Sequence, residues 1–120
     1  MTAKELVSDY YRDGAFRNKD NMKNYLHDDL LVKWHSSKGY LELEKEDLLA
    51  LAAELDKSYS AARLDITHII SEGNLVTVRY THYVNAIENP GEEMVLAHFV
   101  VIWEVKDNKF HRGYLMSQLG

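Results

Sequence analysis

The sequence predicts an α+β fold in which helices come first and an antiparallel sheet follows. Two observations carry this prediction. Segments with the 3.6-residue period of amphipathic helices dominate the chain before residue 60, and segments with strand-like alternation follow one another after it. Short turn sequences separate these later segments, which is typical of a meander of antiparallel strands.

Two strong helices are predicted in the first half of the chain. Thr2 and Glu5 form the capping-box pattern that begins a helix, and the apolar residues that follow share one helical face. A second helix is expected over 44–57, where acidic residues at the start favour the helix dipole. A short helix carrying Met22 and Tyr25 is expected between them. The apolar stripe of the second strong helix comprises Leu48, Leu51, Ala52 and Leu55.

Five strands are predicted from alternation, β-branched residues and the turns between them. Their ranges are 30–35, 62–71, 75–87, 94–105 and 110–118. The turns are expected at 36–39, 72–74, 89–92 and 106–109. In the third of these turns, Pro90 and Gly91 stand where a type II turn favours them.

Composition restricts the class of protein. The chain has 120 residues, a length that fits a single domain over 1–120, and it contains no cysteine, which excludes disulfides and thiolate chemistry. With 14 basic and 19 acidic residues the net charge is −5, and no basic cluster suits nucleic acid. The N-terminus does not resemble a signal peptide, and no apolar run is long enough to span a membrane. We therefore expect a cytoplasmic protein.

The faces of two strands predict how the sheet is covered. Within 75–87, one face is the more apolar and is expected to face the helices; it comprises Val76, Val78, Tyr80, His82 and Val84. Within 94–105, both faces are apolar, and the few predicted helices can cover only one of them. The other face, which includes Met94, Val100 and Ile102, predicts a homodimer through the outer face of the sheet.

Four segments resemble motifs of one superfamily, in the same order and over nearly the whole chain. They are Phe16–Asp20, Asp28–His35, Ser71–Tyr80 and Trp103–Phe110. The chain is thereby similar to the nuclear transport factor 2-like superfamily, and in particular to its SnoaL-like, polyketide cyclase-like branch. It departs from the pattern at Lys19 and Asn108, where glycine is usual, although asparagine tolerates left-handed backbone.

The resemblance implies a cone-shaped, curved antiparallel sheet wrapped around N-terminal helices, an α+β barrel with an interior pocket, and a dimer formed through the sheet. It does not imply one chemistry, because members range from isomerases and cyclases to transport factors and ligand binders. The catalytic positions of the ketosteroid isomerases correspond here to Trp34, Arg12 and Val101, which lack the required chemistry. That isomerase mechanism is therefore not expected.

His82 is the candidate catalytic residue. Its side chain titrates near neutral pH, which suits general acid–base chemistry, and it lies on the inward face of its strand. Asp65, Asp9 or Asp13 could orient it. The alternative is a structural histidine that is buried and hydrogen-bonded to a tyrosine or to the backbone.

The remaining site candidates are expected to line the pocket. The expected aromatic lining comprises Tyr10, Trp34, Tyr80, Phe99, Trp103 and Tyr114. Arg112 shares the alternation of Phe110 and Tyr114, so it either provides a pocket cation for an acidic ligand or points outward after a bulge. The aromatic set could equally be ordinary core.

No cofactor or metal is expected, because the histidines lack zinc-binding spacing and no nucleotide-binding glycine motif occurs. The sequence therefore predicts a pocket for a small, largely apolar or weakly acidic molecule. Three functions remain open: a cofactor-free acid–base enzyme such as a cyclase, isomerase, dehydratase or hydrolase, a non-catalytic ligand binder, and a protein-interaction module on the same scaffold.

Overall fold

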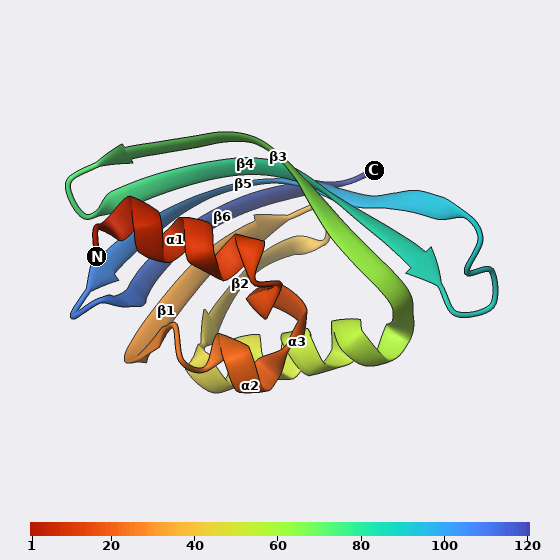
Figure 1. Cartoon of the computed structure of the whole chain (residues 1–120), viewed down its shortest axis with the longest axis horizontal. Helices are drawn as coiled ribbons and strands as arrows, with labels where there is room; N and C mark the ends of the chain where they lie inside the picture. The colour runs from red at the N-terminus through yellow and green to blue at the C-terminus, as the bar shows by residue number, and fades with distance from the viewer.

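Helices cover one face of a curved six-stranded sheet in the computed structural model, which describes all 120 residues (Figure 1). The helical elements are α1 (Ala3–Arg12), the 3₁₀ turn η1 (Ala15–Arg17), α2 (Lys19–Met22) and α3 (Lys45–Ser58). The strands are β1 (Leu26–Ser36), β2 (Gly39–Glu44), β3 (Tyr59–Glu72), β4 (Leu75–Ala86), β5 (Glu93–Lys106) and β6 (Lys109–Leu119). The prediction of helices followed by an antiparallel meander is confirmed for β3 to β6.

The predicted helix starts are confirmed by their caps. The Thr2 hydroxyl accepts a hydrogen bond from the Glu5 amide at 3.1 Å, and the Glu5 carboxylate accepts one from the Thr2 amide. At α3 the N-cap is Glu44, whose amide donates to the Asp47 carboxylate at 2.8 Å. These bonds satisfy amides that would otherwise have no intrahelical partner.

The sheet runs in the order β2-β1-β6-β5-β4-β3. All neighbouring strands are antiparallel except β1 and β6, which pair in parallel and so bring the first strand beside the last. The α+β prediction with a curved sheet around the N-terminal helices is confirmed. The sheet is open, however, because the edge strands β2 and β3 do not pair with each other, so no closed barrel forms.

Two segments differ from the sequence prediction. The short helix ends at Met22, and β1 begins at Leu26, four residues before the predicted strand. β2 was not predicted, because it is short and leads directly into α3. It forms a hairpin with β1 across the turn at 36–39, so this turn lies at the end of a two-stranded ribbon.

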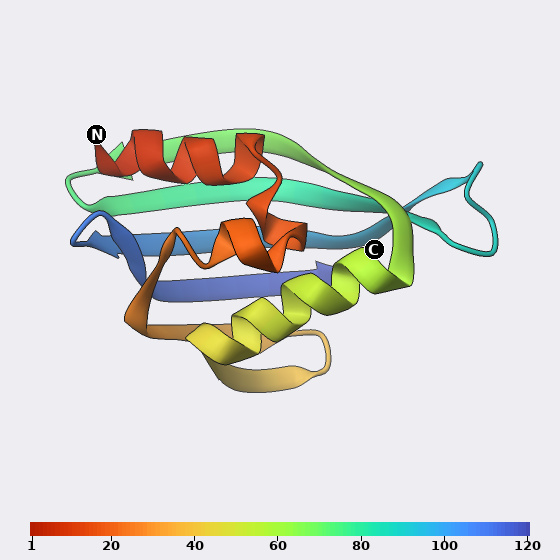
Figure 2. The same cartoon turned by 60° about the horizontal axis from the view of Figure 1, so that its bottom comes forward.

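The main core lies between α1 and the sheet. On β4 the predicted inward face is confirmed, since Val76, Val78 and Val84 are fully buried. α1 packs on β3 and β4, whereas α3 crosses the β1–β2 end of the sheet, so the two long helices cover different parts of it (Figure 2). No helix has the length and apolar character needed to cross a membrane.

Candidate functional site

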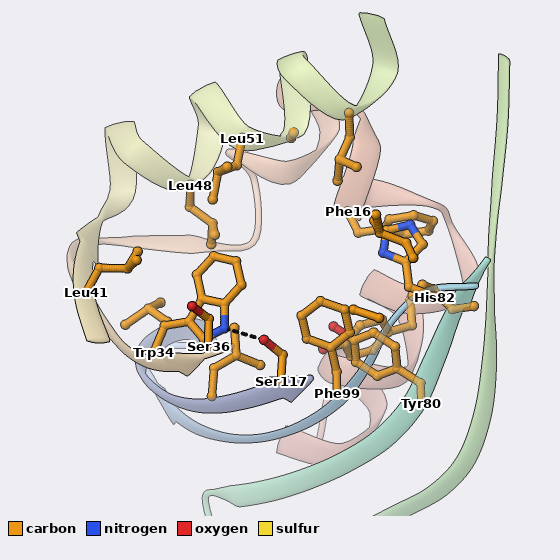
Figure 3. Close-up of a pocket in the computed structure, with 18 of the residues that line it drawn as sticks. Phe16, Trp34, Ser36, Leu41, Leu48, Leu51, Tyr80, His82, Phe99 and Ser117 are labelled. Atoms are coloured by element: carbon orange, nitrogen blue, oxygen red, sulfur yellow. Dashed lines mark hydrogen bonds between the residues drawn. The ribbon is translucent and has the colours of Figure 1, made fainter. Parts of the chain in front are cut away.

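A cavity of about 390 Å³ lies between α3 and the concave face of the sheet (Figure 3). Of its 24 lining residues, 19 are hydrophobic, so a bound molecule would meet a mainly apolar surface. The leucines of α3 form one wall, and inward side chains of β1, β4, β5 and β6 form the other. The polar lining residues are Ser36, Ser37, Lys38, His82 and Ser117.

Aromatic side chains from three strands form one wall of the cavity. The rings of Tyr80 and Phe99 are stacked, with centroids 5.1 Å apart. The ring centroids of Phe99 and Trp34 are 6.4 Å apart. The indole Nε1 of Trp34 donates a hydrogen bond to the Ser117 hydroxyl at 2.8 Å, which fixes the orientation of the indole (Figure 3). These three predicted lining residues therefore lie side by side on the cavity surface.

Tyr10 and Trp103 also line the cavity, and both belong to the buried core. The Trp103 Nε1 donates to the Tyr11 hydroxyl at 2.9 Å, which links the sheet to α1. Burial raises the pKa of Tyr10, Tyr11 and Tyr80, so all three phenols are neutral at physiological pH. This part of the cavity thus offers neutral hydroxyl groups and aromatic faces.

His82 lies on the cavity wall of β4 and is only 4% exposed. Its ring stands edge-on to Phe16, with centroids 5.4 Å apart. The Nε2 atom is buried and has no hydrogen-bond partner in the protein. Burial, assisted by the positive charge of Arg17, lowers the pKa of His82 from 6.5 to about 4, so the imidazole is neutral at physiological pH.

None of the three carboxylates considered for orienting His82 does so. Asp9 pairs with Arg12 on the exposed side of α1, and Asp13 accepts a hydrogen bond from Tyr25 at 3.0 Å. Asp65 is exposed, because its neighbour Leu64 occupies the inward position that faces the cavity. The site therefore holds no histidine–carboxylate pair of the kind found in catalytic triads.

Arg112 and Tyr114 do not line the cavity, so their inward placement is corrected. β6 carries an extra residue, His111, between its pairings with Val105 and Glu104, and this bulge reverses the alternation that begins at Phe110. The Arg112 guanidinium instead donates to the backbone carbonyls of Asp29 and His111, each at 2.8 Å. Tyr114 is 42% exposed on the outer face.

The cation that does line the cavity is Lys38, which sequence reasoning missed. It lies in the exposed turn between β1 and β2, next to Ser36 and Ser37, at the rim of the cavity. The one feature that could have indicated Lys38 is the position of this turn in the fold. That position becomes informative only once β2 is known to fold back along β1.

The other histidines lie away from His82. His98, on the outer face of β5, bonds the Thr81 hydroxyl at 3.0 Å, so His82 and His98 occupy opposite faces as predicted. His27 and His111 pack together at the far end of β1, with ring centroids 4.6 Å apart. No three histidine or carboxylate side chains come together in a metal-binding arrangement.

A curved sheet with helices and an apolar cavity on its concave face is the arrangement expected for the SnoaL-like class. The chain belongs to the SnoaL-like family, because the model of the SnoaL-like domain matches residues 7–112. A comparison with curated proteins found no match.

Solved structures of related proteins share this fold. IdmH from Streptomyces antibioticus, a candidate polyketide cyclase, superposes with a TM-score of 0.78 at 13% identity, over 98% of this chain and 92% of IdmH. A protein with a ketosteroid isomerase-like fold from Catenulispora acidiphila, in complex with trimethylamine, superposes with a TM-score of 0.72 at 13% identity. The match covers 92% of this chain and 83% of that protein. TerC, co-crystallised with polyporic acid, superposes with a TM-score of 0.67 at 21% identity, over 94% of this chain and 88% of TerC. At these identities the likeness establishes the fold alone.

Proposed function

We propose that this protein binds a small, largely apolar molecule in the cavity under α3. The observation that carries the proposal is the cavity itself, about 390 Å³ in volume and lined mainly by apolar side chains. It extends beside both Trp34 and Trp103 rather than being filled by them. The co-crystallisation of the similarly folded TerC with an organic acid supports the same use of the fold.

Acid–base catalysis at His82, without a cofactor, is the second candidate function. It is supported by the inward position of His82 and by its buried Nε2 atom, which has no hydrogen-bond partner in the protein. A pKa of about 4, however, makes the imidazole a weak base at neutral pH, and no carboxylate is paired with it. These two observations favour binding over catalysis.

The proposal is tested with N-phenyl-1-naphthylamine, an uncharged dye whose fluorescence rises in apolar cavities. We expect saturable binding by the native protein. In Leu51→Trp, the larger side chain enters the cavity from α3, and binding should weaken at least about tenfold, equivalent to about 1.4 kcal/mol.

The matched control is Leu75→Trp. Leu75 is about as exposed as Leu51 (42% against 37%) but lies outside the cavity. It should leave the dye affinity unchanged. Equal binding by the native protein and Leu51→Trp would contradict the proposed cavity site. For catalysis, an unchanged turnover of an identified substrate by His82→Ala would remove the role of His82.

We also propose that two copies associate through the outer face of the sheet. Val100 pairs with Met116, and Ile102 pairs with Tyr114, so exposed apolar side chains of β5 and β6 form a continuous patch. Light scattering at micromolar concentration should give twice the mass of the chain. Ile102→Lys should give a monomer, whereas a native monomer would refute the pairing.

A further inference from the structure

The polar groups of the cavity are unevenly placed. Ser36 and Ser117 lie at one end, beside Trp34, and His82 lies at the other end, beside Phe16 (Figure 3). The stretch between them is covered by the aromatic wall and by the leucines of α3. A molecule that fills this space must be apolar along its length, and it can place polar atoms only near the two ends.

The charge on the cavity surface has one sign. Lys38 is the one charged residue in the lining, and no aspartate or glutamate is among the 24 lining residues. The ammonium group of Lys38 forms no ion pair with the protein, although the chain carries 19 acidic residues. Its own amide donates to the Ser36 hydroxyl at 3.2 Å, which holds the turn at the cavity rim.

From this arrangement we infer that the cavity selects an amphipathic anion, such as an organic acid with an extended apolar body. Its acidic group would meet Lys38 and the hydroxyls of Ser37 and Ser117. These two hydroxyls accept hydrogen bonds from the Leu119 amide and the Trp34 indole, so each keeps its proton to donate. The apolar body would lie along Trp34 and Phe99 toward His82. This inference rests on the proposed ligand-binding function and specifies the class and the orientation of the ligand.

The net charge of −5 does not oppose this inference. Charges farther apart than about 8 Å are largely screened at physiological ionic strength, so the nearest charge decides the interaction with a bound group. The one charged side chain in the cavity lining, Lys38, is positive. Since Lys38 is exposed, its pairing with an anion should have a modest effect and should weaken with salt.

Two dyes with the same rings test the inference. 8-Anilinonaphthalene-1-sulfonate carries a permanent negative charge, whereas N-phenyl-1-naphthylamine lacks the sulfonate and is neutral. In Lys38→Gln we expect the affinity for the anionic dye to fall by about three- to tenfold and the affinity for the neutral dye to stay unchanged. The salt dependence of the anionic dye should fall together with its affinity.

The control is Lys33→Gln, which removes the same charge from β1, the strand that leads into the turn of Lys38. Lys33 is exposed and lies between Val32 and Trp34, which line the cavity, so its side chain points to the opposite face of β1. It should alter neither affinity. If Lys38→Gln changes both dyes equally or neither of them, the inference is overturned while ligand binding stands. If the native protein binds neither dye, the proposed function itself fails.

Discussion

Trp103 and Tyr11, 92 residues apart in the sequence, are joined by a buried hydrogen bond from the indole Nε1 to the phenol oxygen at 2.9 Å. Through this bond α1 is fixed to β5 at the side of the cavity. Neither group could be buried cheaply alone, because a polar atom removed from water without a partner costs about 1–3 kcal/mol.

Removing the acceptor should destabilise the fold. In Tyr11→Phe the Trp103 Nε1 keeps its burial and loses its partner, so the free energy of unfolding should fall by about 1–3 kcal/mol. Denaturation in urea measures the change. The control is Tyr40→Phe. The Tyr40 hydroxyl donates to the Glu42 carboxylate at the exposed surface, so removing it should lower the free energy of unfolding by less than about 0.5 kcal/mol. Equal effects of the two variants would contradict a structural role for the buried bond.

His82 should make the stability depend on pH. The pKa of His82 is about 4 in the folded protein and 6.5 in the unfolded chain, so between these values only the unfolded chain takes up the proton. The free energy of unfolding should therefore fall by about 3 kcal/mol as the pH drops from about 6.5 to about 4. Above pH 6.5 this contribution is complete.

The measurement compares urea denaturation of the native protein with that of His82→Gln and His82→Leu, which do not titrate in this range. Other groups contribute equally to all three proteins, so the difference between their pH profiles isolates His82. Both variants should lose the additional slope between about pH 6.5 and 4. Parallel profiles for all three proteins would show that the His82 pKa is not lowered by burial.

Gly113 should be intolerant of any side chain. A Cβ atom at this position would lie 2.7 Å from Cζ3 of Trp103, which is too close for real side chains, and 3.2 Å from Cγ2 of Val32, a tight contact. Gly113→Ala should displace the indole and cost about 1–3 kcal/mol of stability, with an altered near-ultraviolet dichroism signal from Trp103. Gly91→Ala, which meets nothing within 4 Å, serves as the control. A stable Gly113→Ala with an unchanged spectrum would refute this packing.

Two substitutions of Asn108, in the turn between β5 and β6, should change the stability of the protein in opposite directions. Asp107 and Asn108 have φ of 54° and 58°, the left-handed backbone of a tight hairpin turn. Asn108→Gly should stabilise the protein by roughly 0.5 kcal/mol, because glycine adopts this conformation without strain. Asn108→Ala should destabilise it by about 1 kcal/mol. Thermal unfolding of the two variants provides the test. If both variants were more stable than the native protein, or both less stable, the assigned conformation would be contradicted.

Local patterns in the sequence were sufficient to predict most of the fold. A capping box predicted the start of α1, an acidic run predicted that of α3, and alternation predicted the inward face of β4, including His82. Alternation failed at β6, because a single bulged residue, His111, reverses the face of every side chain after it. Nothing local to Arg112 marks that bulge, since it depends on pairing with β5.

The candidate site was harder to predict because it depends on contacts distant in sequence. The parallel pairing of β1 with β6 brings Trp34 beside Ser117, and neither segment alone indicates its partner. Lys38 is a common residue in a common kind of turn. It becomes notable only when β2 folds back and places that turn at the cavity rim.

The helix α3 has one consequence for how binding can be observed. Ala52 is its single fully buried residue, and Leu48, Leu51 and Leu55 line the cavity, although Leu48 also packs against the core. A bound apolar molecule would therefore supply much of the packing of α3, and it would raise the free energy of local opening by about 2.7 kcal/mol at a hundredfold excess over its Kd. Amide hydrogen exchange in α3 should slow more than in α1, which makes this helix the natural reporter in a search for the ligand.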